Sequence, residues 1–97
     1  MHFIVKKYGL KIKQTESDEE ALIAIRSGKK LVIVNVTNET VAGKNDFWTT
    51  GGHYLVLAGA SGDDVWVQDP GGRNESGKYN FDKYIKPAAW WYSIIYK

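Results

Sequence analysis

Apolar residues recur along this chain mostly at the two-residue period that is typical of β-strands. The predicted strands are Leu10–Gln14, Leu31–Val36, His53–Ala60, Val65–Asp69 and Ala89–Tyr96. Leu31–Val36 is apolar at nearly every position, which favours a central strand, whereas the alternating lysines of Leu10–Gln14 suit an exposed edge. Ser61, Gly62 and Asp63 between the third and fourth segments predict a hairpin.

Helical signals are fewer and shorter. Ser17 and Glu20 have the spacing of a capping box, an apolar stripe follows at helical spacing over 21–25, and Gly28 would end this helix. His2–Tyr8 resembles the last turns of another helix, and Asn80–Ile85 a single capped turn before Pro87. The order of elements predicts an α+β domain, in which an antiparallel β-sheet of about four to six strands is packed by one to three short helices.

Composition narrows the possible functions. The 97 residues include four Trp, six Tyr and three Phe, enough large side chains for the core of one small domain. Thirteen Lys and Arg against eleven Asp and Glu, with no long run of like charge, argue against nucleic acid as a partner. No apolar stretch is long enough to cross a membrane, and the first ten residues lack the pattern of a signal peptide.

The chain contains no cysteine, which excludes disulfides, thiolate metal sites and a thiol nucleophile of its own. His2 and His53 are the two histidines, and neither has the clustered carboxylates of a metal site. No glycine-rich phosphate loop is present. We therefore expect neither a metal nor a cofactor.

His53 and Asp69 are the candidate catalytic residues, because a histidine and a carboxylate can form two members of a nucleophile–base–orienter triad. An isolated histidine at a strand start is more often satisfied by a backbone carbonyl than catalytic, but Asp69 ends the neighbouring predicted strand. Hairpin geometry decides whether they meet, since the side-chain direction alternates at each residue. A loop of two or four residues would place Asp69 opposite Val56, facing away from His53. A loop of three or five residues, or a bulge, would place it opposite Leu55, on the histidine's face.

Other residues near this pair could bind a ligand. Gly52, just before His53, leaves room for close approach to the ring, and Trp48 and Trp66 could line a groove. Thr37–Thr50 is a long irregular stretch, which is either a functional loop or an idle surface loop. Thr49 and Thr50 are remote alternatives for a nucleophile, and the aromatic strand 89–96 fits a core strand better than a ligand platform.

The run GGHYLVL at 51–57, followed by VWVQDP at 65–70, resembles the C-terminal half of bacterial C39-like cysteine peptidases of the papain-like superfamily. The flanking segments fit the same pattern over essentially the whole chain. The resemblance implies a single half-domain over residues 1–97, with His53 as the base and Asp69 as its orienter. In that family, a cysteine attacks the scissile carbonyl and a preceding glutamine helps to hold the oxyanion. The segment that would carry both is not present here, so we expect the chain to be inactive alone. The family is often bacterial and extracytoplasmic.

Three hypotheses follow. The chain is the His/Asp half of a truncated or split C39-like peptidase, or a degenerate peptidase-like module that binds a peptide or protein near His53, or a small structural domain whose match is coincidental. The third requires His53 and Asp69 to face opposite sides of the sheet. A separate cysteine-bearing segment is the expected partner of the first. Apolar surface left uncovered by that segment would favour a homodimer, through sheet edges or the terminal helix.

Overall fold

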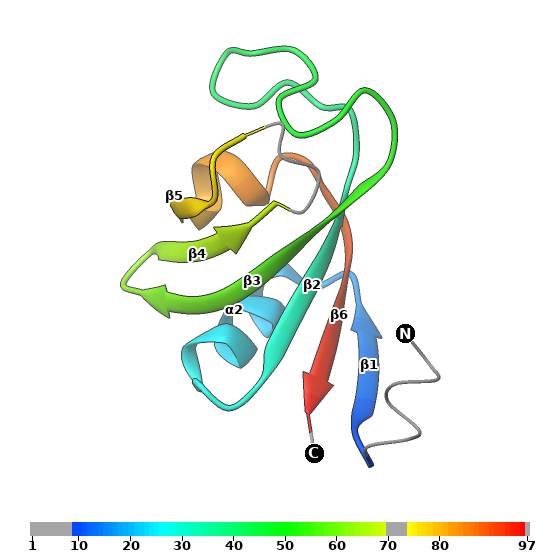
Figure 1. Cartoon of the computed structure of the whole chain (residues 1–97), viewed down its shortest axis with the longest axis vertical. Helices are drawn as coiled ribbons and strands as arrows, with labels where there is room; N and C mark the ends of the chain where they lie inside the picture. The colour runs from blue at the N-terminus through cyan, green and yellow to red at the C-terminus, as the bar shows by residue number, and fades with distance from the viewer. Residues whose placement is uncertain (1–8, 70–73, 97) are drawn as a thin grey trace.

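A computed structural model describes residues 9–69 and 74–96, and its main element is a six-stranded antiparallel sheet (Figure 1). The strands are β1 (Lys11–Thr15), β2 (Leu31–Val36), β3 (His53–Ser61), β4 (Asp64–Gln68), β5 (Gly77–Asn80) and β6 (Ala89–Tyr96), in the spatial order β1-β6-β2-β3-β4-β5. The helical elements of the described residues are α2 (Asp18–Arg26) and a short π-helical turn, η1 (Phe81–Ile85). The α+β prediction is confirmed.

One face of the sheet carries the core. Val32, Val34 and Val36 of β2 are fully buried beside Leu55 and Leu57 of β3. Ala21, Ala24 and Ile25 of α2 and Phe81 and Ile85 of η1 belong to the same core cluster. We call this the inner face. The apolar run predicted for a central strand is therefore confirmed, with β2 between β6 and β3.

The local signals around α2 are confirmed in part. Ser17 caps the helix, its Oγ accepting from the backbone N–H of Glu20 at 3.1 Å, and Gly28 follows the helix with a φ of 70°. The reciprocal half of the capping box does not form. The Glu20 carboxylate instead pairs with Lys13 of β1, and the backbone N–H of Ser17 donates to Thr15 Oγ1.

Two further expectations need comment. No strand was predicted between Asp69 and Asn80, but Gly77–Asn80 forms β5, whose backbone pairs with β4 as an edge strand. Asn80 does cap the following turn, accepting from the Lys83 N–H at 3.0 Å. The helix expected at His2–Tyr8 lies outside the described residues.

Candidate peptidase-like site

A β-bulge decides the position of Asp69. The turn between β3 and β4 has only two residues, since Ser61 pairs with Asp64, and an unbroken ladder would have placed Asp69 on the wrong face. The register shifts by one between Leu57 and Gly59, leaving Ala58 as the extra residue, and Val56 then pairs with Gln68. Asp69 follows opposite Leu55, diagonal to His53. The bulge alternative predicted from the sequence is the one that the structure adopts.

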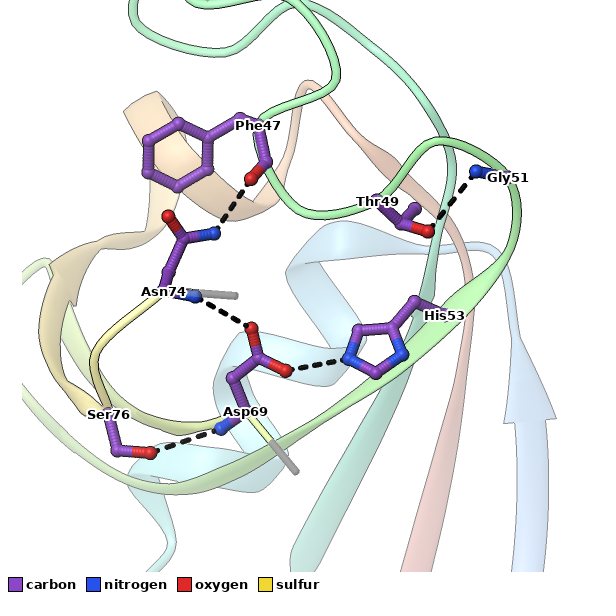
Figure 2. Close-up of polar contacts among 7 residues, drawn as sticks. All are labelled: Phe47, Thr49, Gly51, His53, Asp69, Asn74 and Ser76. Carbon is purple, nitrogen blue, oxygen red and sulfur yellow. Dashed lines mark hydrogen bonds and ion pairs between the residues drawn. The ribbon is translucent and has the colours of Figure 1, made fainter. Parts of the chain in front are cut away.

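The two side chains meet directly. The Nε2 atom of His53 lies 2.6 Å from Oδ1 of Asp69 (Figure 2). The Asp69 side chain is fully buried, whereas 24% of the His53 side chain remains exposed. One member of the pair is therefore held inside the protein, and the other reaches the surface.

Backbone and side-chain groups around Asp69 hold its carboxylate in place. Oδ2 accepts from the backbone N–H of Asn74 at 3.4 Å, and the backbone N–H of Asp69 donates to Ser76 Oγ at 3.2 Å (Figure 2). The side-chain amide of Asn74 donates to the carbonyl of Phe47 at 2.7 Å. The Asn74–Phe47 hydrogen bond thereby joins the segment after β4 to the loop before β3.

This arrangement defines what the imidazole can do. A carboxylate only accepts hydrogen bonds, so the Nε2–H of His53 is the donor in this contact. In the neutral ring the proton then resides on Nε2, and Nδ1 keeps its lone pair. A histidine oriented in this way by a buried carboxylate can take a proton at Nδ1 from a group on its exposed side.

The structure places the predicted ligand-binding residues in three different settings. Trp48 is buried, with 1% of its surface exposed, and its Nε1–H donates to the carbonyl of Tyr84 at 2.7 Å. Trp66 is half-exposed but alternates with the buried Val65 and Val67, so it lies on the sheet face away from His53. Of these three residues, Gly52 is the one that is both exposed and adjacent to His53, with open space where a side chain would project.

Trp48 supports the site rather than lining a groove. Its ring packs edge-on against those of Phe47 and Tyr79, with centroids 4.8 and 5.1 Å away, and Phe47 also contacts Tyr84. The Phe47 carbonyl is the group that Asn74 binds. The end of the Thr37–Thr50 stretch, at Phe47 and Trp48, is therefore anchored in the core.

Of the two threonines, Thr49 has a hydrogen bond to a nearby backbone group. The hydroxyl of Thr49 accepts from the backbone N–H of Gly51 at 3.1 Å, within its own turn (Figure 2). Asn74 and Ser76 were missed as site residues because they follow Asp69 in a polar stretch with no pattern of its own. Their nearness to Asp69 in sequence was the one available signal.

Within residues 9–69 and 74–96, no three His, Asp or Glu side chains gather as metal ligands would. Over the same ranges, the helices are too short or too polar to span a bilayer.

Comparison with known proteins agrees with the geometry. The family model described as "Peptidase_C39 like family" matches residues 4–94, nearly the whole chain. A search of curated proteins found no match to the chain. With that match over a fold that brings His53 and Asp69 together, the chain belongs to the Peptidase_C39-like family.

Proposed function

We propose that His53 and Asp69 are the base and the orienting carboxylate of a cysteine peptidase site whose nucleophile comes from outside these 97 residues. The observation that carries the proposal is the 2.6 Å contact between the His53 ring and the buried carboxylate of Asp69. On this proposal the chain by itself does not cleave peptides, because it has no cysteine to form an acyl intermediate.

The chemistry assigns each atom a task. Nδ1 of His53 takes the proton of the incoming thiol, and the thiolate attacks the scissile carbonyl carbon. The imidazolium, stabilised by Asp69, returns the proton to the leaving amine as the C–N bond breaks. Water, activated by the same histidine, then hydrolyses the thioester and regenerates the thiol. Without the sulfur, the pair can polarise water but cannot follow the covalent route.

An open groove supports the idea of a further segment on the inner face. It has a volume of about 640 Å³ and lies between α2 and the β1–β6 end of the sheet. Its lining is mixed. Ile23, Ala24, Ile94 and Tyr96 supply the apolar part, and Ile23 is 59% exposed, whereas the charged part consists of Lys13, Glu19, Glu20 and Lys30. Ile94 belongs to the same sheet face as Val32 and Leu55. The groove lies at the opposite end of the sheet from the histidine, since Ile94 pairs with Val32 whereas His53 pairs with Val36. A segment packed there would have to continue along the inner face to reach His53.

A second candidate is a degenerate module that binds a peptide beside His53 without cleaving it. The exposed backbone of Gly51 and Gly52, with open space around both, favours this alternative. The third hypothesis, a coincidental match, loses its main support because His53 and Asp69 face each other.

Complementation tests the proposal. The 97-residue chain is mixed with a polypeptide that carries a Gln–Cys helix from the adjoining coding sequence, and cleavage of fluorogenic peptides is followed. We expect cleavage that iodoacetamide blocks and that His53→Ala reduces by about 10²- to 10⁴-fold, the usual contribution of a general base. His2→Ala removes the other histidine and serves as the matched control.

The alternatives give different results. Cleavage that survives His53→Ala would contradict the assignment of the base. If no partner restores cleavage but a peptide binds, and His53→Ala abolishes that binding while His2→Ala does not, the binding module is the correct function.

A further inference from the structure

Asn74 connects the two sides of the candidate site, one through its backbone and the other through its side chain. Its backbone N–H donates to Oδ2 of Asp69 at 3.4 Å, and its side-chain amide donates to the carbonyl of Phe47 at 2.7 Å (Figure 2). A carbonyl oxygen only accepts hydrogen bonds, so the NH₂ group of the amide faces Phe47. Asn74 therefore contacts both the carboxylate that orients His53 and the stretch of chain that leads into His53.

The two contacts differ in strength. The 2.7 Å contact with Phe47 is short for an N–H···O hydrogen bond, whereas the 3.4 Å contact with Asp69 is longer than the usual range of about 2.7–3.2 Å. A small displacement of the Asn74 backbone would therefore break the contact with Asp69. The side-chain anchor at Phe47 limits such a displacement.

The anchor point is itself held by buried aromatic residues. The ring of Phe47 packs edge-on against Trp48, with centroids 4.8 Å apart, and lies 5.5 Å from the ring of Tyr84. Trp48 is 1% exposed, and its indole N–H donates to the Tyr84 carbonyl at 2.7 Å. The carbonyl that Asn74 binds thus belongs to a packed part of the loop.

We propose that Asn74 is a positioning residue. Its side chain, anchored at Phe47, holds its backbone N–H against the Asp69 carboxylate, and the carboxylate in turn keeps the His53 proton on Nε2. The tautomer matters because a neutral ring with its proton on Nε2 leaves the Nδ1 lone pair free for a thiol. The inference deepens the proposed function, on which its catalytic consequence rests.

The tautomer of His53 in the isolated chain tests this role. Asn74→Ala removes the anchoring amide, and Asn74→Asp keeps its shape but sets an oxygen that cannot donate against the Phe47 carbonyl. Nitrogen-15 NMR, at a pH where the imidazole is neutral, measures the ratio of the Nε2–H to the Nδ1–H tautomer. We expect both variants to lower that ratio by about two- to tenfold, the effect of weakening one hydrogen bond.

Two controls separate positioning from charge and from stability. Asn45→Asp makes the same chemical change at an exposed residue, whose side-chain oxygen accepts from Thr40 Oγ1 at 2.8 Å and remains an acceptor. Val32→Ala removes buried contacts four residues along β2 from Val36, the residue that pairs with His53. Neither control should change the tautomer ratio. Thermal unfolding of each variant measures whether the fold is retained.

Three results would overturn the proposal. The first is an unchanged tautomer ratio in Asn74→Ala. The second is a shift in Asn74→Asp alone, because the added charge would then be the cause. The third is an equal shift in Val32→Ala, because general loss of stability would then explain the effect.

The complementation assay adds a kinetic readout. Asn74→Ala should lower kcat by on the order of tenfold and leave KM nearly unchanged, because it misplaces the base and does not remove a contact with the peptide. A raised KM with an unchanged kcat would contradict the positioning role. Failure of every partner to restore cleavage would count against the proposed function alone, since the tautomer measurement needs only the isolated chain.

Discussion

Asp69 is the residue on which the geometry of the candidate site depends. Its carboxylate contacts the His53 ring through one oxygen and the Asn74 backbone through the other. Its own backbone N–H binds Ser76. A side chain fixed at several points can orient the imidazole without itself reaching solvent, so a change at Asp69 should disturb the orientation of His53 before it disturbs the sheet.

Two variants separate orientation from packing. Asp69→Ala should cost about 1–3 kcal/mol of the free energy of unfolding, because buried partners lose their acceptor. Asp69→Asn keeps an oxygen acceptor and should cost less. By proton NMR, the Nε2–H of His53 should give a downfield, slowly exchanging signal that persists weakly in Asp69→Asn and disappears in Asp69→Ala. A signal unchanged in Asp69→Ala would show that another group orients the ring.

At the scale of elements, a hydrogen bond joins α2 to β6 in the middle of the sheet. The buried Tyr92 of β6 donates its hydroxyl proton to Oδ1 of Asp18, in the first turn of α2, at 2.5 Å. Burial, with the nearby carboxylate as a second cause, raises the pKa of Tyr92 far above its usual value near 10. The packing of α2 therefore depends on a phenol that stays protonated.

Alkaline pH should expose this dependence. The unfolded chain releases the Tyr92 proton near pH 10 while the folded chain holds it, so the folded state loses stability as the pH rises above 10. Tyr92→Phe should be less stable at neutral pH by about 1.5–3 kcal/mol, the usual contribution of a hydrogen bond to a charged group. Its stability should fall less steeply between pH 9 and 11. Urea unfolding at several pH values measures both effects.

Tyr84→Phe is the matched control for this prediction. The substitution keeps the ring contacts of Tyr84 with Phe47 and Tyr79. Its stability should follow the wild-type pH dependence. An equally steep alkaline loss in Tyr92→Phe would mean that other groups cause the loss.

At the scale of the whole molecule, cohesion is concentrated in the middle of the sheet. β2 is hydrogen-bonded to β6 on one side and β3 on the other, and its three inward valines are fully buried. β1 and β5 each have one strand neighbour. Local opening is easiest where few buried contacts hold a strand, so the two edges should open before the centre.

Hydrogen exchange measures this gradient. Amides of β2 and of the central part of β6 should exchange only through global unfolding, whereas those of β1 and β5 should exchange at least tenfold faster. Urea well below the unfolding midpoint should accelerate the β2 amides more than the edge amides, since global opening exposes more surface. Equal protection of β1 and β2 would contradict the gradient.

Much of this fold could be predicted from local patterns. The Ser17 cap, the Gly28 stop and the apolar run of β2 each have a near-neighbour cause, and all three are present. β5 could not be predicted in this way, because Gly77–Asn80 has few of the apolar residues that mark a strand. It forms because β4 offers it an unpaired edge.

The candidate site was predictable only as a set of alternatives. The spacing of His53 and Asp69 allowed only a few strand registers, but the bulge at Ala58 has no distinct sequence signal that would select among them. The burial of Trp48 was not foreseen, since the loop around it has no periodicity. Its indole N–H donates a hydrogen bond to the carbonyl of Tyr84, 36 positions away in the chain.

The bulge at Ala58 has a consequence for how such a chain can vary. The number of residues between His53 and Asp69 decides which face of the sheet Asp69 occupies. Adding or removing one residue there would therefore turn the Asp69 carboxylate away from the imidazole. Changes of two residues, or a loss matched by a compensating gain, would preserve the encounter. Length variation in this hairpin should therefore come in pairs wherever the histidine and aspartate work together, and single-residue differences should mark relatives in which they no longer do.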